Sequence, residues 1–567
     1  MERLFITTKN MMEKRRNDHG SGEGINMGVK AKIADFRQKI QLGEKLGGWM
    51  LAFGISFSLL GNLFLKADLR SEYITWIVAL IGGTVAAKFI VMKLCIKINA
   101  VEPYFHVNNG KVSIICTLIF AGNTMIYWIA FYPGNMFVDT YYQFTQIFGS
   151  LPNGDWHSFG HTLFMKVVMQ ICDNPAMIVF VQIIAMVYII FRIFREAAKM
   201  GYHPKFLYFI SGMLSINLSY GLLIVNIWKD TLYTICLLYL FFFLYRNVDS
   251  NFTELHDLLI GVFGFLGVLF FRHNGFMVAL LVLMVMITLS RMKFKMMVFA
   301  GAIISSYFLV TTCVFSVMEV EENAKITGYL PLLHGIAAVE FHCGADSLDE
   351  DTREFMDSLL PEDGWVVKYN PYNGDPLLFE TDGILQERCE RLSMLDVLKP
   401  YVRTFLRNPF LIIKDRMASC ELVWSVFPTV GSYNHIVGLG IDNRSFYNDT
   451  RLHQEFGVQE ITPNEFTTLI QKCFYMIHDH VFLNIIHFRP AWLFWILGFS
   501  MLCIPVCKRK KWVAVLPICL NTLSLLIAMN FQAFRYVWYV FECVPFVVLL
   551  LYGETIGGNR MHFKREP

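Results

Sequence analysis

Long apolar stretches alternate with short polar segments along most of the chain. A helix that crosses a membrane needs about 20 mainly apolar residues. Twelve segments approach this length, so the sequence predicts an all-α polytopic membrane protein with about twelve transmembrane helices. The segments are residues 49–65, 73–92, 112–131, 175–191, 206–227, 231–245, 258–271, 276–290, 296–317, 490–507, 512–530 and 536–552.

The polar segments between these helices differ in their content of Lys and Arg. With the N-terminus placed in the cytoplasm, the cytoplasmic segments hold 28 of these residues and the short segments on the opposite side hold 6. Loops rich in Lys and Arg stay in the cytoplasm. The difference therefore predicts a multi-pass protein of the cell membrane with both termini cytoplasmic.

The pattern divides the chain into five parts. A basic tail precedes an N-terminal transmembrane module, which includes a long outer loop at 132–174 and which we expect to be catalytic. A polar and mainly helical insert outside the cytoplasm, long enough for its own core, separates this module from the last transmembrane helices and a short cytoplasmic tail. The parts are residues 1–48, 49–317, 318–489, 490–552 and 553–567.

Composition narrows the classes of partner. Apolar residues make up 55% of the chain and charged residues 17%, against about 25% charged in soluble proteins. A net charge of +3 is too small to indicate nucleic acid, so the lipid bilayer is the expected partner. Cysteine spacing in the insert does not decide whether disulfides form; the cysteines concerned are Cys343, Cys389, Cys420 and Cys473.

The first half of the outer loop carries an acid beside aromatic residues. If the segment around Asp139 is a helix, Asp139 and Gln143 share one face, because they are about one turn apart. The opposite face, with Tyr141, Phe144 and Phe148, suits a helix that lies on lipid. A carboxylate held against apolar groups has a raised pKa, which suits a general base. The alternative is that Asp139 only complements the helix dipole.

The second half of the outer loop carries an Asp-Trp-His cluster. Asp155 and His157 follow a Pro-Asn-Gly turn, and His161 is four residues further on. On a helix, His157 and His161 would share a face, which is a metal-ligand spacing but a weak signal without a third ligand. A His that orients an acid or binds phosphate is an equal alternative, as is Asp155 as a helix cap. The cofactor is therefore unknown, and a divalent metal is left open.

Three further turns are expected at the same membrane face. They carry cations together with polar partners, and Arg is suited to bidentate binding of phosphate. Snorkelling of Lys and anchoring of Arg at the interface are the simpler interpretations. The residues are Lys229 and Asp230, then Arg272, His273 and Asn274, and finally Arg535.

These motifs resemble those of the GT-C superfamily of membrane glycosyltransferases, and most closely an uncharacterised bacterial branch of it. The signatures are YPG-x4-D-x3-Q, D-x-H, WKD and R-x-NG, spread over residues 112–290. In this chain they read Tyr132-Pro133-Gly134, Asp139, Gln143, Asp155-Trp156-His157, Trp228-Lys229-Asp230 and Arg272-His273-Asn274-Gly275.

The resemblance implies a function and a role for each site residue. GT-C enzymes use an acid in the first outer loop and usually a polyprenyl-phosphate sugar as donor. By resemblance, Asp139 is the leading catalytic acid or base and Asp155 the second, while Lys229, Arg272 and Arg535 lie near the donor phosphate.

We therefore expect a sugar to move from a lipid-linked donor to an extracytoplasmic acceptor, a cell-envelope glycan or lipid. The main alternative is a transporter or flippase of a lipid-linked substrate, for which twelve spans are also typical. An envelope polymerase or ligase of another fold and a non-enzymatic scaffold are further alternatives.

Overall fold

The computed structural model describes most of the chain, and the described part is helical. Its only strand-like pairings are three isolated bridges. The predicted basic tail lies outside the described residues except for its last three positions, and so does the predicted C-terminal tail from residue 559 onward. The described residues are 46–68, 70–98, 104, 108–429, 431 and 464–558.

The all-α membrane class is supported by the length and composition of the helices. Among the described residues, seven helices are long and apolar enough to cross a membrane, and the number is nine if each of two bent pairs counts as one span. The pairs bend by 59° between Ile216 and Leu218 and by 54° between Phe488 and Ala491. All twelve predicted segments fall on helices, but a count of about twelve crossings stays a prediction.

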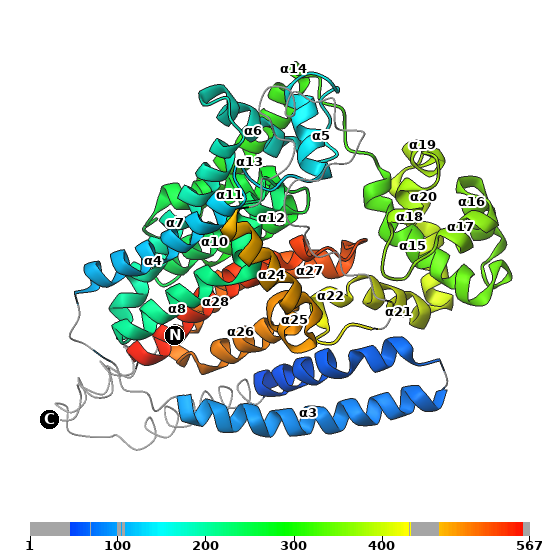
Figure 1. The fold of residues 1–567 in the computed structure, drawn as a ribbon. Helices are drawn as coiled ribbons and strands as arrows, with labels where there is room; N and C mark the ends of the chain where they lie inside the picture. Colours follow the sequence, from blue (N-terminus) through cyan, green and yellow to red (C-terminus); the bar gives the residue numbers. More distant parts are fainter. Residues whose placement is uncertain are drawn as a thin grey trace, which may run out of the picture.

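A large bundle forms the main body of the molecule (Figure 1). Its centre is α10 (Lys229–Asn247), whose Leu, Phe and Tyr side chains are buried on every side. A helix that is apolar all round is stable only inside other elements. The helices that enclose α10 are α7 (Ala176–Ala197), α11 (Leu258–Phe271) and α28 (Phe534–Gly558). The bundle helices that matter below are α4 (Asn109–Ala130), α5 (Val138–Ile147), α6 (Phe159–Ile171), α7 (Ala176–Ala197), α8 (Pro204–Ile216), α9 (Leu218–Ile224), α10 (Lys229–Asn247), α11 (Leu258–Phe271), α12 (Gly275–Leu289), α13 (Lys293–Leu309), α24 (Glu465–Asp479), α25 (Val481–Phe488), α26 (Ala491–Cys503), α27 (Leu516–Ala528) and α28 (Phe534–Gly558).

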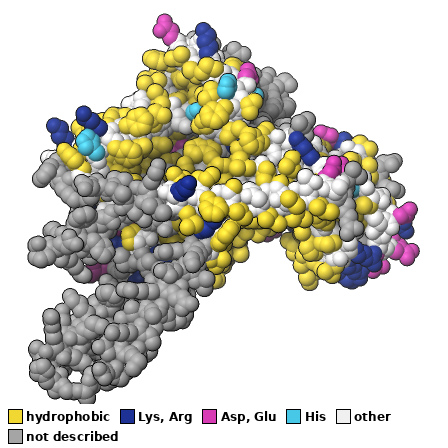
Figure 2. Space-filling view, turned by 90° about the horizontal axis from the view of Figure 1, so that it is seen from below, with side chains coloured by type: hydrophobic (Ala, Val, Ile, Leu, Met, Phe, Trp, Pro, Cys, Tyr) yellow, Lys and Arg dark blue, Asp and Glu magenta, His cyan; other side chains and the backbone are white. Residues whose placement is uncertain are grey.

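Several helices leave their apolar side chains uncovered. The helix Leu46–Lys66 and α3 (Arg70–Ile98) form a long hairpin along one side of the bundle (Figure 1). Only 17% of the α3 span and 11% of the span that contains α13 are buried. Hydrophobic side chains also cover much of the face in Figure 2. Apolar surface of this extent fits contact with lipid.

A second hydrophobic core lies within the insert. Its residues lie between Ile326 and Ile412, so this core includes only part of the predicted insert, residues 318–489. By contrast, α24 and α25 pack on the bundle, where the Thr467 hydroxyl donates to the Ala130 carbonyl (2.6 Å). The helices of the insert are α15 (Ile326–Cys343), α16 (Glu350–Leu359), α17 (Glu362–Lys368), α18 (Asp375–Phe379), α19 (Ile384–Glu390), α20 (Met394–Arg407), α21 (Pro409–Ser419) and α22 (Glu421–Trp424).

The four insert cysteines are unpaired. Cys343 is exposed, Cys473 is partly buried, and Cys389 and Cys420 are buried. Cys389 and Cys420 therefore each pack as a small apolar side chain does.

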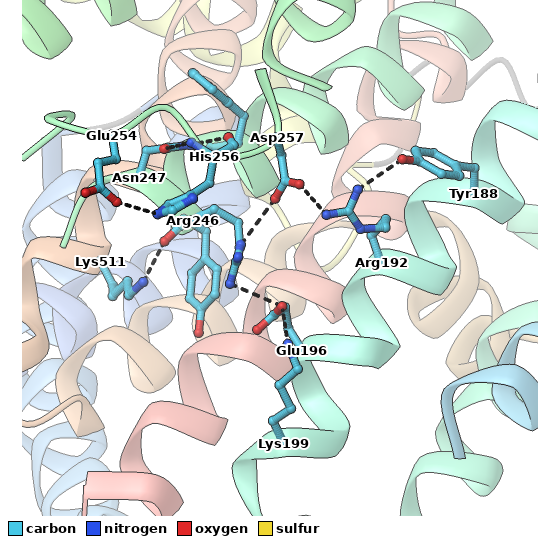
Figure 3. A network of polar contacts seen from close by, with 12 residues as sticks. Tyr188, Arg192, Glu196, Lys199, Arg246, Asn247, Glu254, His256, Asp257 and Lys511 are labelled. Carbon is cyan, nitrogen blue, oxygen red and sulfur yellow. Dashed lines mark hydrogen bonds and ion pairs between the residues drawn. The ribbon is translucent and has the colours of Figure 1, made fainter. Parts of the chain in front are cut away.

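One end of the bundle is held by a network of charged side chains (Figure 3). Asp257, directly before α11, pairs with Arg192 of α7 and with Arg246 of α10, the latter at 3.2 Å. Arg246 also contacts Glu196 at 3.2 Å. The network thus ties three helices together at the C-terminal ends of α7 and α10.

We expect Asp257→Asn to destabilise the bundle by about 1–3 kcal/mol. The substitution leaves two partly buried guanidinium groups without their shared carboxylate. The measurement is the thermal unfolding midpoint of the purified protein. Asp346→Asn is the matched control, because Asp346 is fully exposed where it pairs with Arg353; equal midpoints for the two variants would contradict the prediction.

Candidate functional site

Two backbone segments far apart in the sequence are joined next to the site. The Asn135 N–H donates to the Val225 carbonyl (2.9 Å), and the Ile227 N–H donates to the Asn135 carbonyl (3.1 Å). Gly134 makes this approach possible: its φ is +148°, and a Cβ there would lie 2.6 Å from a methyl group of Val179. The YPG motif therefore holds the start of α5 beside the start of α10.

Asp139 is at the centre of a polar cluster. Its Oδ2 accepts a hydrogen bond from Nη1 of Arg535 at 2.5 Å and lies 3.6 Å from Nδ1 of His157. The ammonium group of Lys229 lies 3.2 Å from the same ring nitrogen. Asp139 and Arg535 are each 16% exposed. Four predicted site residues from four separate segments are thus in contact.

The charge state of the cluster follows from burial and from its cations. Burial alone would raise the pKa of Asp139, but the charges of Arg535, His157 and Lys229 and the hydrogen bond from Arg535 hold it well below its usual range. Burial lowers the pKa of His157 to about 3, with Lys229 and Arg535 adding to the effect and Asp139 opposing it. At neutral pH, Asp139 is therefore ionised and His157 is neutral. The expectation of a raised pKa at Asp139 is wrong, because cations rather than apolar groups face the carboxylate.

A second ion pair lies beside the first. Arg272, in the turn between α11 and α12, contacts the buried Asp230 at 3.0 Å. The guanidinium of Arg272 lies 5.0 Å from the ring of Tyr536, and that of Arg535 lies 5.2 Å from the same ring. Arg535 is also 5.0 Å from the ring of Trp228. Stacking on aromatic rings holds a guanidinium in place without neutralising it, so Tyr536 positions both arginines.

Lys229 differs from the two arginines. Within the described part of the chain, no carboxylate lies at ion-pair distance from it, and its ammonium group contacts the neutral ring of His157. Lys229 is thus the cation of the cluster with the most charge left for an anionic ligand.

The turn that carries Arg272 is fixed by its neighbours. The Asn274 amide donates to Asn521 (3.1 Å) and to Ser524 (2.8 Å) of α27. A Cβ at Gly275 would lie 1.8 Å from the Val268 carbonyl, so only glycine fits there. Asn274 therefore supports the turn and does not itself contact the Asp139 cluster.

Asp155 lies near the site and also has a structural role. Its Oδ1 accepts a hydrogen bond from the N–H of Phe159 (2.6 Å), the first residue of α6, and so takes on part of a capping role although the N-cap position is Ser158. His273 lies 3.7 Å from the other carboxylate oxygen. The Asp155 N–H donates to the Glu321 carbonyl (2.9 Å), which attaches the loop to the start of the insert. Capping, the alternative considered from sequence, is the clearest function of Asp155.

Two expectations for the outer loop are wrong. His157 precedes α6, which begins at Phe159, so His157 and His161 share no helix face. His161 is buried, and its Nδ1 bonds to Gln143 (2.9 Å). Among the described residues, no group of three His, Cys, Asp or Glu side chains is placed to hold a metal. In α5, Tyr141 and Phe144 are fully buried, so the aromatic face packs on protein rather than lipid.

One further acid lies near the site and was not expected from the sequence. The Gly374 N–H donates to the Asn530 carbonyl (2.7 Å), which brings the first turn of α18 to the bundle. Asp375 follows directly. Burial raises the pKa of Asp375 to about 6, with Asp139 adding to the effect and Arg535 opposing it. Asp375 therefore lies within the field of the Asp139–Arg535 pair.

Sequence reasoning missed Asp375 because it lies in a turn far from the motifs. The only available signal was the Pro-Tyr-Asn-Gly-Asp-Pro stretch, which indicates a turn but not its location.

Comparison of the chain with protein-family models, with curated protein sequences and with solved structures gives no match.

Proposed function

We propose that the protein is a membrane glycosyltransferase that moves a sugar from a lipid phosphate to a hydroxyl acceptor. The observation that carries the proposal is the cluster of ionised Asp139 with Arg535 and Lys229 at one end of a bundle whose interior is mainly apolar. Ionisable groups in such a place are costly unless a site needs them. The GT-C-like motifs converge on this cluster, which supports the same proposal.

The donor phosphate is proposed to bind at Lys229. The N-terminal first turns of α5, α10 and α28 carry Asp139, Lys229 and Arg535. Helix N-termini attract anions through their unpaired N–H groups and dipoles. Lys229 adds a full positive charge, and Arg272 and Arg535 are close enough to share theirs with a phosphate.

Asp375 is proposed as the proton acceptor. A base works best when its pKa is near the operating pH, and a pKa of about 6 meets this better than the strongly lowered pKa of Asp139. In the proposed step, the acceptor oxygen forms a bond to the anomeric carbon and its proton moves to Asp375. The bond from that carbon to the phosphate oxygen breaks, and the phosphate leaves with the electron pair.

Asp139 has a different role in this mechanism. Its carboxylate fixes Arg535 and lies beside the position where positive charge develops on the sugar during displacement. A preorganised anion at that position lowers the barrier.

The first test is donor consumption. Membranes that contain the protein are incubated with a panel of polyprenyl-phosphate sugars, with and without a chelator, and loss of donor is followed by mass spectrometry. We expect consumption of at least one donor, slowed about 10- to 100-fold by Lys229→Gln through weaker phosphate binding. Lys166→Gln is the matched control, since Lys166 lies on α6 outside the cluster. No consumption of any donor would contradict the proposal.

A transporter of a lipid-linked substrate is the second candidate. The observation in its favour is the pair of bent spans, since transporters often place sites at discontinuous helices. Reconstituted vesicles that move a labelled polyprenyl-phosphate sugar across the bilayer without altering it would favour this candidate.

A further inference from the structure

A small cavity lies inside the bundle, away from the Asp139 cluster. It is formed where the two bent spans approach α28. Residues next to both bends line it, with Leu214 and Asn217 from one and Trp492 from the other. Its volume is about 50 Å³, which is room for a few water molecules and too little for a sugar or a lipid chain.

An acid without a cationic partner faces this cavity. Glu542 of α28 is 1% exposed and lines the cavity. Its carboxylate oxygens make no hydrogen bond of regular geometry, and the nearby polar group is the indole of Trp538, one turn earlier on the same helix. The indole N–H of Trp492, also in the lining, makes no hydrogen bond either. Buried polar groups are almost always paired, and a buried carboxylate inside a membrane bundle is costly unless it is neutralised.

No cation of the protein neutralises this carboxylate within the described residues. The ionisable groups that interact with Glu542 are Tyr220 and Cys543, and neither carries a positive charge. Arg489, at the bend between α25 and α26, interacts with Glu421 instead. Either a proton on its carboxyl group or a bound cation must therefore neutralise Glu542.

Besides the N–H groups of Trp492 and Asn217, the cavity has oxygen atoms that could bind a cation. Pro545 lies inside α28 and has no N–H, so it leaves the carbonyl of Phe541, one turn earlier, without its helical hydrogen bond. Phe541 and Pro545 both line the cavity, as does Tyr220 with its hydroxyl. Carboxylate, carbonyl and hydroxyl oxygens are the ligands that hard cations prefer.

We propose that this cavity binds one small monovalent cation, with Glu542 as its charged ligand. A single charge matches the single carboxylate, whereas a divalent ion would leave a net charge in an apolar interior. Sodium fits a site of this size. The alternative is a proton, which would reside on the Glu542 carboxyl group itself and neutralise it without a bound metal ion. The bound cation would join α28 to the two bent spans. Glu542 lies two helical turns from Arg535 on α28, about 10 Å along the helix.

The test is direct binding to the full-length protein in lipid nanodiscs. Binding of radioactive ²²Na⁺ is measured at constant ionic strength, with choline as the replacing ion and K⁺ as competitor. In parallel, the unfolding midpoint and tryptophan fluorescence are followed against Na⁺ concentration and, without Na⁺, against pH. We expect saturable binding near one ion per chain, or, if the cation is a proton, a pH-dependent transition that Na⁺ does not shift.

Two substitutions test whether the response to Na⁺ or to pH depends on Glu542. Glu542→Gln should abolish the Na⁺ or proton response, whereas Glu554→Gln, on the same helix at the other end of the bundle, should retain it. If Glu542→Gln does not fold, Tyr220→Phe serves instead, with affinity lowered about tenfold at unchanged stoichiometry. A wild type with neither response, or an unchanged response in Glu542→Gln, would overturn the proposal.

Discussion

Asp139→Asn is expected to lower sugar transfer by at least about 1000-fold. The asparagine side chain fills the same space but carries no charge. Arg535 then loses its carboxylate partner, which lies at 2.5 Å, and the developing positive charge on the sugar loses its counterion. Both losses affect the transition state more than the ground state, so the rate constant should fall while the donor concentration at half-maximal rate changes little.

Two controls separate this effect from misfolding. The amount of Asp139→Asn protein in the membrane should stay within the range of the wild type, although its unfolding midpoint should fall because Arg535 is left without its carboxylate. Asp173→Asn makes the same chemical change in the same outer loop, beyond the far end of α6, and should transfer at the wild-type rate. Transfer by Asp139→Asn at a near-normal rate would remove this residue from the mechanism.

Asp375→Asn is the second substitution with a large expected effect. Loss of a general base costs about 100- to 10,000-fold. With a pKa of about 6, Asp375 is the deprotonated base above that pH and becomes protonated below it. The wild-type rate should therefore fall as the pH is lowered through about 6, and the remaining activity of the variant should lack this decline.

The pH profile distinguishes catalysis from a structural role. A turn that merely failed to dock would lower the rate at every pH and leave the shape of the profile unchanged. Asp382→Asn is the matched control, because Asp382 is exposed in the same insert and its φ of +49° is one that Asn tolerates. A variant profile that keeps its decline near pH 6 would assign the base to another group.

The sequence predicted that the turns which carry the site residues lie at one end of the bundle. An apolar segment of membrane-spanning length fixes which end of the helix each flanking turn occupies, so Lys229, Arg272 and Arg535 were expected at one face with Asp139. Their pairing was not predictable, because it depends on which helices are neighbours. Arg535 is 396 residues from Asp139.

The errors in the outer loop have a common physical cause. Hydrophobic periodicity shows that one face of a helix is buried, but it does not show whether lipid or protein covers that face. The sequence therefore could not exclude lipid as the cover of the apolar face of α5. Tyr141 and Phe144 are covered by protein. Glu542 was overlooked for a related reason: one acid does not interrupt an apolar stretch, although an acid inside a predicted span is itself a signal of function.

The backbone hydrogen bonds between Asn135 and residues 225–227 affect which amino-acid substitutions the protein tolerates. These contacts use backbone N–H and carbonyl groups, so most side chains at neighbouring positions can be exchanged without separating α5 from α10. The frame would survive substitutions that alter the charge or size of the reacting groups. New substrate preferences could therefore arise in single steps at the positions around Asp139 and Lys229, each step taken on an intact fold.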